Sequence, residues 1–447
     1  MNDKKIGIIG AGLTGLSAAF QLQIYGAEVS LFEKRSDPGG SIKSVKNNDW
    51  LVEYGPNSIL LKDVTVLNFL KDLDLGDKLI EADPDAAKRY ILKNGTLTAT
   101  PSGLGNAFTT SLFSISSKLR VLGEPFVSKS NNPDETVAGF VQRRIGKEIL
   151  DYAINPLVAG IFAGNPEKLS MRYAFPQMYE MEQEYGSLIA GSLAGFRKRK
   201  NIGRIKRRLI SFPDGIQSLP RKIANSLTNT HFNHLVKAIS RNRDQWFIHT
   251  TLGKYGPFDE IILNVPAYKM KEIIMPSESV NMGFFEEIAY PPVSIAALGF
   301  NKSNVEHPLD GFGFLVPELE NRDILGTLFN SSLFPGRAPS GHVLLTTFVG
   351  GMRQPELAQL ESELLFSLVQ DELSDILGVK GDPVFREHIF WPQAIPQYHP
   401  GYDTILEKIN DLENKLPGIH FAGNFRGGIS VPDCIKNGLK LADTVSG

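Results

Sequence analysis

The glycine-rich stretch from Gly10 to Gly15, close behind the N-terminus, constrains the fold of this chain more than any other feature. It separates an apolar strand pattern over 4–9 from a helical pattern over 13–25, and an alternating pattern over 27–33 predicts a second strand. A strand–helix–strand unit requires a right-handed crossover and a parallel sheet. The sequence therefore predicts an α/β fold.

The same turn is suited to a dinucleotide. Gly10 permits a tight turn, Gly12 allows the backbone to approach a pyrophosphate, and Gly15 allows close packing of helix on strand. The N-terminus of the following helix attracts phosphate charge. Glu33 ends the second strand, where a carboxylate can accept hydrogen bonds from both hydroxyls of a ribose.

Three later features favour FAD over NAD. A second glycine pair, Gly39 and Gly40, allows another close backbone approach that an NAD site does not need. The carboxylate of Glu33 argues against a ligand with a 2′-phosphate, although the cations of Lys34 and Arg35 leave such a ligand open. The stretch 53–58 offers a turn whose amides could line a flavin edge. Near the C-terminus, a strand, a glycine-rich loop and a helix start follow one another over 418–435, and a helix N-terminus can stabilise negative charge on a reduced flavin.

Length and composition limit the number of domains, the partners and the cellular location that we expect. With 447 residues the chain is long enough for two or three domains, and a net charge of −2 gives no reason to expect a nucleic-acid partner. One cysteine, Cys434, excludes an internal disulfide, and the N-terminus leads directly into a strand without room for a signal peptide. No apolar run is long enough to span a bilayer. We therefore expect a cytoplasmic protein whose membrane contact, if any, is peripheral.

One basic run stands out at 197–208, with eight Lys or Arg among twelve residues. It could contact anionic lipid or nucleic acid. A solvated connection between domains is favoured, because the run is isolated and no stacking aromatic side chains are interleaved with it.

Taken together, the motifs resemble the protoporphyrinogen oxidase family within the flavin amine-oxidase superfamily, and the resemblance runs along the whole chain. The N-terminal unit is shared by the superfamily. More specific are the motifs at 55–58, 160–171, 211–220, 290–293, 325–337, 394–398 and 422–431.

The resemblance implies non-covalent FAD and oxidation of protoporphyrinogen IX to protoporphyrin IX by O2, with six electrons leaving in three flavin cycles and three H2O2 formed. The closely related oxidation of coproporphyrinogen III, which carries four propionates rather than two, stays open, as does a homodimer. The residues that match the family's cofactor contacts are Gly10, Ala11, Gly12, Leu13, Thr14, Gly15, Glu33, Lys34, Gly40, Ser41, Gly55, Pro56, Asn57, Ser58, Val236, Trp391, Gly423, Asn424, Ile429, Ser430 and Val431.

For the substrate, Arg89 matches the family arginine that pairs with a propionate, a role that a guanidinium fork suits. A surface arginine at a strand start is the alternative. Asn57 and Gly164 match cavity positions. The apolar side chains that could form cavity walls, each of which could equally be ordinary core, are Phe314, Leu315, Leu333 and Phe348.

No catalytic acid, base or nucleophile is expected, because hydride transfer to a flavin needs positioning and exclusion of water rather than a reactive side chain. No metal site is expected either: His231 and His234 are three apart, but no Cys or carboxylate cluster completes a site. Amine oxidation and a non-catalytic FAD-fold binding protein are the more distant alternatives.

Three parts are expected. The FAD-binding domain takes 1–60, 205–270 and 385–447, a mixed α+β substrate domain takes 61–85, 180–204 and 271–384, and a helical segment takes 86–179. Within this last segment, 102–127 is apolar with few charges and falls where the family carries membrane attachment. A helix that covers its own substrate cavity is the alternative for these residues.

Overall fold

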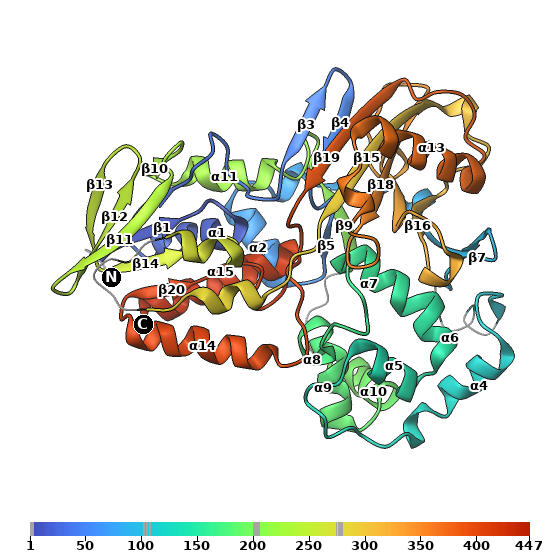
Figure 1. Cartoon of the computed structure of the whole chain (residues 1–447), viewed down its shortest axis with the longest axis horizontal. Coiled ribbons are helices and arrows are strands. Elements are labelled where there is room, and N and C mark those ends of the chain that lie inside the picture. The colour runs from blue at the N-terminus through green and yellow to red at the C-terminus, as the bar shows by residue number, and fades with distance from the viewer. Residues whose placement is uncertain are drawn as a thin grey trace.

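The computed structural model describes residues 4–101, 103, 106, 109–199, 206–273, 275 and 280–447. Figure 1 shows three parts: an α/β domain around a parallel sheet, a domain around a large mostly antiparallel sheet, and a lobe made of helices. The predicted α/β class is confirmed.

The parallel sheet of the α/β domain has the order β10-β2-β1-β14-β20, and its strands come from both ends and the middle of the chain. Its strands are β1 (Lys5–Ile9), β2 (Glu28–Phe32), β10 (Thr230–His231), β14 (Glu260–Leu263) and β20 (Ile419–Phe421). The predicted strand–helix–strand unit is present as β1, α1 (Leu13–Ile24) and β2. Apolar strand residues such as Ile6, Ile8 and Leu31 are fully buried, which explains the continuous hydrophobic pattern.

Helices close both faces of this region. α15 (Val431–Ser446) packs directly on α1, since a Cβ built at Gly438 would lie 2.4 Å from the Thr14 carbonyl oxygen. α2 (Val64–Asp72) and α11 (Ser218–Ser226) complete the same core, and α14 (Tyr402–Lys415) packs beside β20. A three-stranded antiparallel sheet is added by β11 (Val236–Asn242), β12 (Gln245–Thr250) and β13 (Lys254–Phe258).

The second domain is built on a seven-stranded sheet of order β19-β15-β18-β17-β16-β7-β8. Its strands are β7 (Lys88–Lys93), β8 (Thr96–Ala99), β15 (Val293–Asn301), β16 (Gly311–Leu315), β17 (Gly326–Phe329), β18 (His342–Gly350) and β19 (Phe385–Trp391). One face packs under α13 (Ser362–Leu377). The other face packs against a hairpin of β3 (Ser44–Asn47) and β4 (Trp50–Glu53) and against α7 (Asn155–Phe162) of the lobe.

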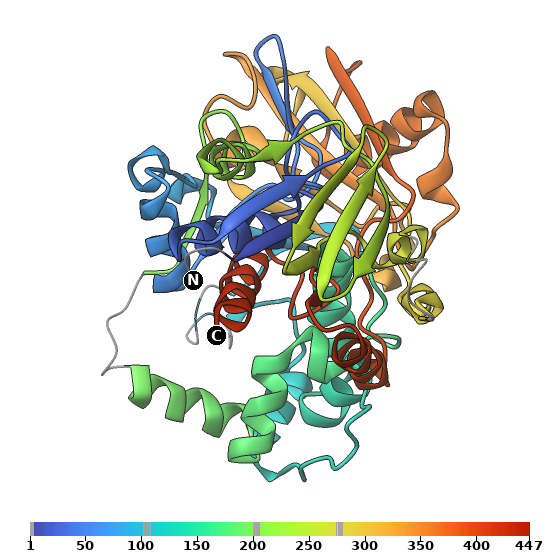
Figure 2. The same cartoon turned by 90° about the vertical axis from the view of Figure 1, so that its left-hand side faces the viewer.

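The helical lobe lies at the lower right in Figure 1, below the seven-stranded sheet, and at the bottom in Figure 2, and it shares a core with the α/β domain. That shared core joins Val137, Phe140 and Phe162 of the lobe to Tyr398 and Phe421. The lobe's other helices are α4 (Ile115–Leu122), α5 (Val137–Arg144), α6 (Lys147–Ile149), α8 (Met171–Ala174), α9 (Pro176–Tyr185) and α10 (Leu188–Arg199), with a π-helical turn at Leu150–Ile154 between α6 and α7.

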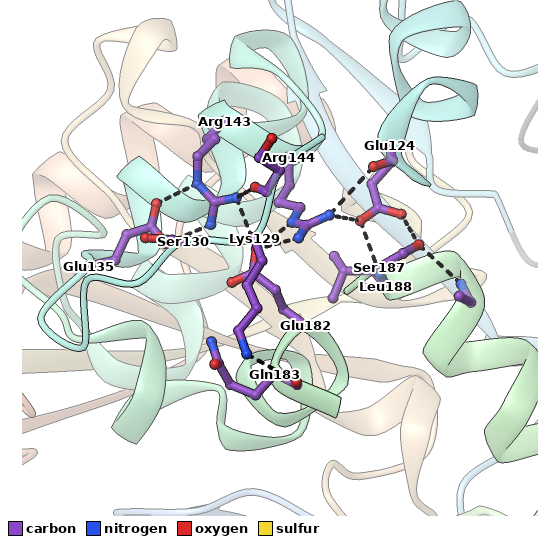
Figure 3. A network of polar contacts seen from close by, with 12 residues as sticks. Glu124, Lys129, Ser130, Glu135, Arg143, Arg144, Glu182, Gln183, Ser187 and Leu188 are labelled. Atoms are coloured by element: carbon purple, nitrogen blue, oxygen red, sulfur yellow. Dashed lines mark hydrogen bonds and ion pairs between the residues drawn. The ribbon is translucent and has the colours of Figure 1, made fainter. Parts of the chain in front are cut away.

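A buried ion network ties the lobe together (Figure 3). The Arg144 guanidinium, fully buried, donates to Glu124 Oε1 at 2.8 Å and to Glu182 Oε1 at 2.5 Å. Glu124 in turn accepts hydrogen bonds from the Ser187 hydroxyl at 2.6 Å and the Leu188 amide at 2.9 Å, and so caps α10. Because these residues come from the end of the α4 region, α5, α9 and the start of α10, the network fixes four segments relative to one another.

The sheet membership of several segments differs from the predicted domain boundaries. β7 and β8 fall inside the predicted helical segment 86–179 yet form one edge of the seven-stranded sheet, and β19 joins the opposite edge of that sheet although 385–447 was assigned to the FAD-binding domain. α10, inside 180–204, belongs to the lobe. The reason is that β7 pairs with β16 and β19 with β15, partners remote in sequence that local patterns do not reveal.

Two predicted features extend beyond the described residues: 102, 104, 105, 107 and 108 in the apolar segment, and 200–205 in the basic run. Within the part of the chain that the structure describes, no helix combines the length and apolar character needed to cross a membrane.

Candidate functional site

The glycine turn between β1 and α1 leaves an open helix N-terminus. Gly10 has φ +97°, and a Cβ there would lie 2.3 Å from the carbonyl oxygen of Asn264, so this position requires glycine. Gly12 is the N-cap of α1 and supplies no side-chain hydrogen bond, and the first turn has no acidic residue. The first amides of α1, including those of Leu13 and Thr14, are therefore available to an anion.

Glu33 lies beside this turn with only 7% of its surface exposed. Its Oε2 accepts from the Ala11 amide at 2.8 Å and its Oε1 from the Arg35 amide at 2.9 Å. The carboxylate is thereby held in one orientation, with further lone pairs free for hydroxyl donors. Val236, another of the residues that match the family's cofactor contacts, lies near Glu33, because the backbone amide of His234 donates to the Glu33 carbonyl oxygen at 2.8 Å just before β11 begins.

The second glycine pair lies against the first turn. The Gly39 amide donates to the Ala11 carbonyl at 2.8 Å, and a Cβ at Gly40 would lie 3.5 Å from the Gly12 Cα. A Cβ at Gly55 would lie 2.1 Å from the Ser41 carbonyl oxygen. The structure therefore brings the turns at 10–15, 39–41 and 55–58 together.

Trp391 belongs to the same group, although it ends a strand of the other domain. Its indole Nε1 donates to the Tyr54 carbonyl oxygen at 2.7 Å. The Tyr54 hydroxyl donates to Glu387 Oε1 at 2.5 Å, and burial together with this neighbouring carboxylate raises the pKa of Tyr54. The seven-stranded sheet thus contributes directly to the turn that contains Gly55, Pro56, Asn57 and Ser58.

Glu53, one residue earlier, is a buried carboxyl group with 1% exposure. It accepts from the Ser44 hydroxyl at 2.5 Å and from the Ile216 amide at 2.9 Å. Burial nevertheless dominates and raises the pKa of Glu53 to about 7, against the attraction of buried Arg337. The carboxyl group of Glu53 is therefore an ionisable group buried next to the turn 55–58.

The C-terminal loop closes the site. Gly423, Gly427 and Gly428 all have positive φ, so the loop from Gly423 to Ser430 takes a path that other residues would resist. Tyr398 holds the loop with its hydroxyl, which donates to the Asn424 carbonyl and accepts from the Gly428 amide. Ile429 then leads into Ser430, the N-cap of α15, and Val431, its first residue.

Three predicted substrate residues share one face of the seven-stranded sheet. Arg89 and Leu315 lie on this face in the paired strands β7 and β16, and Phe348 continues the same row through Gly326. The Arg89 guanidinium lies over the ring of Phe312, 5.6 Å from its centroid, and has no carboxylate partner among the described residues. α7 lies over this face, since a Cβ at Gly160 would meet Leu315 at 2.6 Å.

Two predicted wall residues are placed elsewhere. Phe314 is 2% exposed on the opposite face of the sheet, in the core beneath α13, because side chains alternate along β16. Leu333 is 1% exposed and packs with Ala86 and Phe334 in a small separate core. Both side chains therefore take the ordinary core positions that were the alternative to a cavity wall. Gly164 lies at the end of α7, where a Cβ would meet Gln397 Oε1 at 2.7 Å.

Asn264 is the site residue that sequence reasoning missed. Its side-chain Nδ2 donates to the carbonyl oxygens of Gly10 at 3.1 Å and Gly12 at 3.0 Å, and it leaves no room for a Cβ at Gly15. A signal was present, because Asn264 directly follows the apolar strand β14, and polar residues at the carboxyl ends of parallel strands line ligand sites.

The family model for flavin containing amine oxidoreductases matches residues 13–446. The chain belongs to this family. It is an FAD-dependent oxidoreductase. The residues fit the cofactor, because the glycine turns give the space that Cβ atoms would fill, the α1 amides are open to phosphate and Glu33 is held for hydroxyl donors.

Curated relatives of this flavoenzyme carry porphyrinogen oxidase names. The chain is 35% identical to protoporphyrinogen oxidase 2 of Arabidopsis thaliana over 100% of its own length and 94% of that protein. It is 27% identical to coproporphyrinogen III oxidase of Bacillus subtilis over 97% and 96%, respectively. A crystal structure of a protein from Exiguobacterium sp. 255-15 has the same fold, with a TM-score of 0.81 at 22% identity, covering 99% of this chain and 98% of that one.

The only cysteine of the flavoenzyme is placed for packing. Cys434 lies in the first turns of α15, where burial raises the pKa of its thiol to about 11 despite a hydrogen bond with Thr14. A thiol with such a pKa is a poor nucleophile. Among the described residues, no group of three or more His, Cys, Asp or Glu side chains could hold a metal ion.

Proposed function

We propose that this chain oxidises protoporphyrinogen IX to protoporphyrin IX, using non-covalently bound FAD and O2, with three H2O2 formed per porphyrin. The observation that carries the proposal is the match to protoporphyrinogen oxidase 2 of Arabidopsis thaliana along the whole chain, including the substrate domain. A family likeness confined to the FAD-binding segments would support only the cofactor. Here the motifs of 160–171 and 325–337, which lie outside the parallel sheet, also resemble those of the protoporphyrinogen oxidase family.

The residues suit a flat, largely apolar substrate with carboxylates at its edge. Leu315 and Phe348 offer apolar surface on one sheet face, and Arg89 on the same face has a free guanidinium for a propionate. Asn57 lies in the turn 55–58, next to Tyr54, whose carbonyl oxygen accepts from the Trp391 indole. When bound, FAD accepts the hydride from the substrate. The protein itself binds and orients the substrate and excludes water, so that no side chain has to act as acid or base.

Coproporphyrinogen III is the second candidate substrate, supported by the full-length match to the Bacillus subtilis enzyme. It would place four propionates where protoporphyrinogen IX has two, and would need more cations around the cavity. The higher identity to the Arabidopsis protein favours protoporphyrinogen IX.

The test is a paired oxidation assay. Purified enzyme is given each porphyrinogen under air, and porphyrin fluorescence and O2 uptake are recorded against an autoxidation blank that contains apoprotein. We expect rapid growth of protoporphyrin fluorescence with three O2 consumed per porphyrin, and slower turnover of coproporphyrinogen III. Equal rates with enzyme and blank for both substrates would overturn the proposal. Acid precipitation should release all FAD into the supernatant, as non-covalent binding requires.

We further propose that α4 makes a peripheral membrane contact of a cytoplasmic enzyme. Ile115, Leu119 and Leu122 of α4 are 76%, 63% and 52% exposed, and none of the α4 residues is buried. Phe126, in the short 3-10 turn after α4, is 91% exposed. A helix covering the enzyme's own cavity would bury one face, so the exposure favours an interface with lipid.

Sedimentation with liposomes tests this contact. We expect the wild type to pellet with vesicles and the variant L119S/F126S to stay in the supernatant. Because both side chains are exposed, we expect the variant to fold and bind FAD as the wild type does. Pelleting of both would contradict the assignment. A homodimer also stays a proposal, and light scattering of the purified enzyme decides it.

A further inference from the structure

A buried asparagine of the substrate domain, Asn330, is hydrogen-bonded to Asn57 in the turn 55–58. Asn330 is the first residue of α12 (Asn330–Leu333) and is 3% exposed. Its Nδ2 donates to Asn57 Oδ1 at 2.7 Å. The Asn57 Nδ2 donates in turn to the Gly55 carbonyl oxygen at 3.1 Å. The three groups form a chain that runs from the buried helix to the backbone of the turn.

The carbonyl group of Gly55 fixes which group donates and which accepts in these two hydrogen bonds. A backbone carbonyl can only accept, so Asn57 must turn its Nδ2 toward Gly55 and its Oδ1 toward Asn330. Only the Nδ2 of Asn330 can then donate to that oxygen. The amide orientation of Asn57 is therefore set by Asn330 and Gly55 together, and one N–H and one lone pair of Asn57 remain for other partners.

The two asparagines differ in a way that separates their roles. Asn57 is half-buried, so a ligand can reach it, whereas Asn330 is enclosed. The Oδ1 of Asn330 is buried without a hydrogen-bond partner among the described residues. An unpartnered buried amide oxygen is unfavourable. A leucine of similar size would avoid that penalty but could not donate to Asn57, so the donor bond is the feature that requires asparagine here.

We propose that Asn330 is a positioning residue for the oxidation: it holds the Asn57 amide in the one orientation that serves the bound flavin and substrate. The proposal rests on the proposed function, because the resemblance assigns Asn57 to the cofactor and the substrate cavity. Asn330 itself touches neither group and acts through Asn57.

The decisive variants are N330A and N330D, with S331A as the matched control. Ser331 is the next residue of α12, and its hydroxyl accepts from the Leu344 amide without contacting Asn57. N330A removes the donor without burying a charge, so it remains informative if N330D fails to fold. We expect N330A to lower the rate of flavin reduction by porphyrinogen about tenfold, the effect of one lost hydrogen bond, and S331A to leave it unchanged.

A double-mutant cycle separates positioning from general damage. In an N57A background, N330A should have no further effect on flavin reduction, since its route of action is gone. Additive losses in N57A/N330A would overturn the proposal. So would wild-type rates in N330A.

The pH profile of N330D supplies a signature that structural damage does not produce. The introduced carboxyl can donate to Asn57 Oδ1 only while protonated, so activity should fall as pH rises through its pKa, a limb that wild type and S331A lack. A profile parallel to wild type would contradict the proposal.

A crystal structure of FAD-loaded N330A gives a readout without turnover. We expect the Asn57 side chain to leave Gly55 or to occupy two conformers, whereas an unchanged Asn57 would refute the positioning role. This result is independent of the substrate. If wild type oxidises neither porphyrinogen but Asn57 moves in N330A, the proposed function fails while the structural link stands.

Discussion

The hydroxyl of Tyr398 donates to the carbonyl oxygen of Asn424 at 2.5 Å and accepts from the amide of Gly428 at 3.2 Å. The ring is 3% exposed, and the two contacted groups lie four positions apart in the C-terminal loop. A single side chain therefore closes the loop whose glycines have positive φ. The same tyrosine contacts the lobe, because its carbonyl oxygen accepts from the Ser170 amide at 2.7 Å.

Tyr398→Phe should weaken FAD binding by about 10- to 100-fold, because it removes both hydroxyl contacts and frees the loop at a cost of about 1–3 kcal/mol. The measurement is the dissociation constant of FAD by fluorescence titration of apoprotein. Tyr90→Phe is the control: it removes the hydrogen bond from Tyr90 to Asp310 in the sheet domain, remote from the loop, and should leave the constant unchanged. Equal affinity of Y398F and wild type would show that the loop does not need this contact.

Glu53→Gln should change how stability depends on pH. The folded pKa of about 7 lies above the ordinary value of 4.5, so the carboxyl group contributes its full stability below about pH 4.5 and loses it as pH rises through 7. The loss amounts to roughly 3 kcal/mol by pH 8.5, at about 1.4 kcal/mol per pKa unit.

The check is the free energy of unfolding of FAD-loaded protein between pH 5 and 8.5. Relative to wild type, E53Q should gain stability from pH 5 to about pH 7 and then level off. Glu28→Gln, at an exposed ion pair with Lys5, serves as the control and should run parallel to wild type. An E53Q curve that also runs parallel would mean that Glu53 is ionised throughout.

Arg144→Met should destabilise the helical lobe by about 3–5 kcal/mol, since it leaves the buried carboxylate of Glu124 without a cation and leaves Glu182 with Arg143 alone. Hydrogen exchange should rise at the start of α10, where Glu124 caps the helix. Arg208→Met removes an ion pair with a largely exposed Glu81 and should cost less than about 1 kcal/mol. Similar losses of stability in the two variants would show that burial of the network does not increase its contribution to the free energy of unfolding.

Arg89→Ala should raise KM for the porphyrinogen about 10- to 100-fold and change kcat less, because a charge-assisted contact to a propionate of about 1.5–3 kcal/mol is lost. Arg89→Lys should recover part of the affinity, as an ammonium lacks the bidentate fork. Arg386→Ala, at an exposed ion pair with Glu363, is the control. Unchanged kcat/KM in R89A would remove Arg89 from the site.

Local patterns in the sequence predicted the parts of the fold that are determined by residues close together in sequence. The first strand–helix–strand unit follows from apolar periodicity and from glycines that the turn requires, and Glu33 lies next to Ala11 because the parallel register of β1 and β2 dictates it. The convergence of 39–41 and 55–58 on this turn followed from the family resemblance. Asn264 could have been found from its place after a buried strand.

Local patterns could not predict the parts of the fold that depend on pairing between segments remote in sequence. The positions of β7 and β8 in the sheet depend on β16, which follows the whole helical lobe in sequence. Phe314 and Leu315 are adjacent apolar residues, and only the register decides that Phe314 faces the core. The Arg144 network joins residues 20 and 38 positions apart, without any periodic pattern.

The parallel sheet that carries the cofactor turn has consequences for synthesis on the ribosome. Its edge strand, β20, and the helix that packs on α1, α15, are the last two elements of the described chain. A nascent polypeptide can form the lobe and the seven-stranded sheet first, but its β1–α1 turn remains without these neighbours until translation is nearly complete. We therefore expect FAD loading to be a late, essentially post-translational event, and we expect a chain that stops before residue 431 not to be rescued by added flavin.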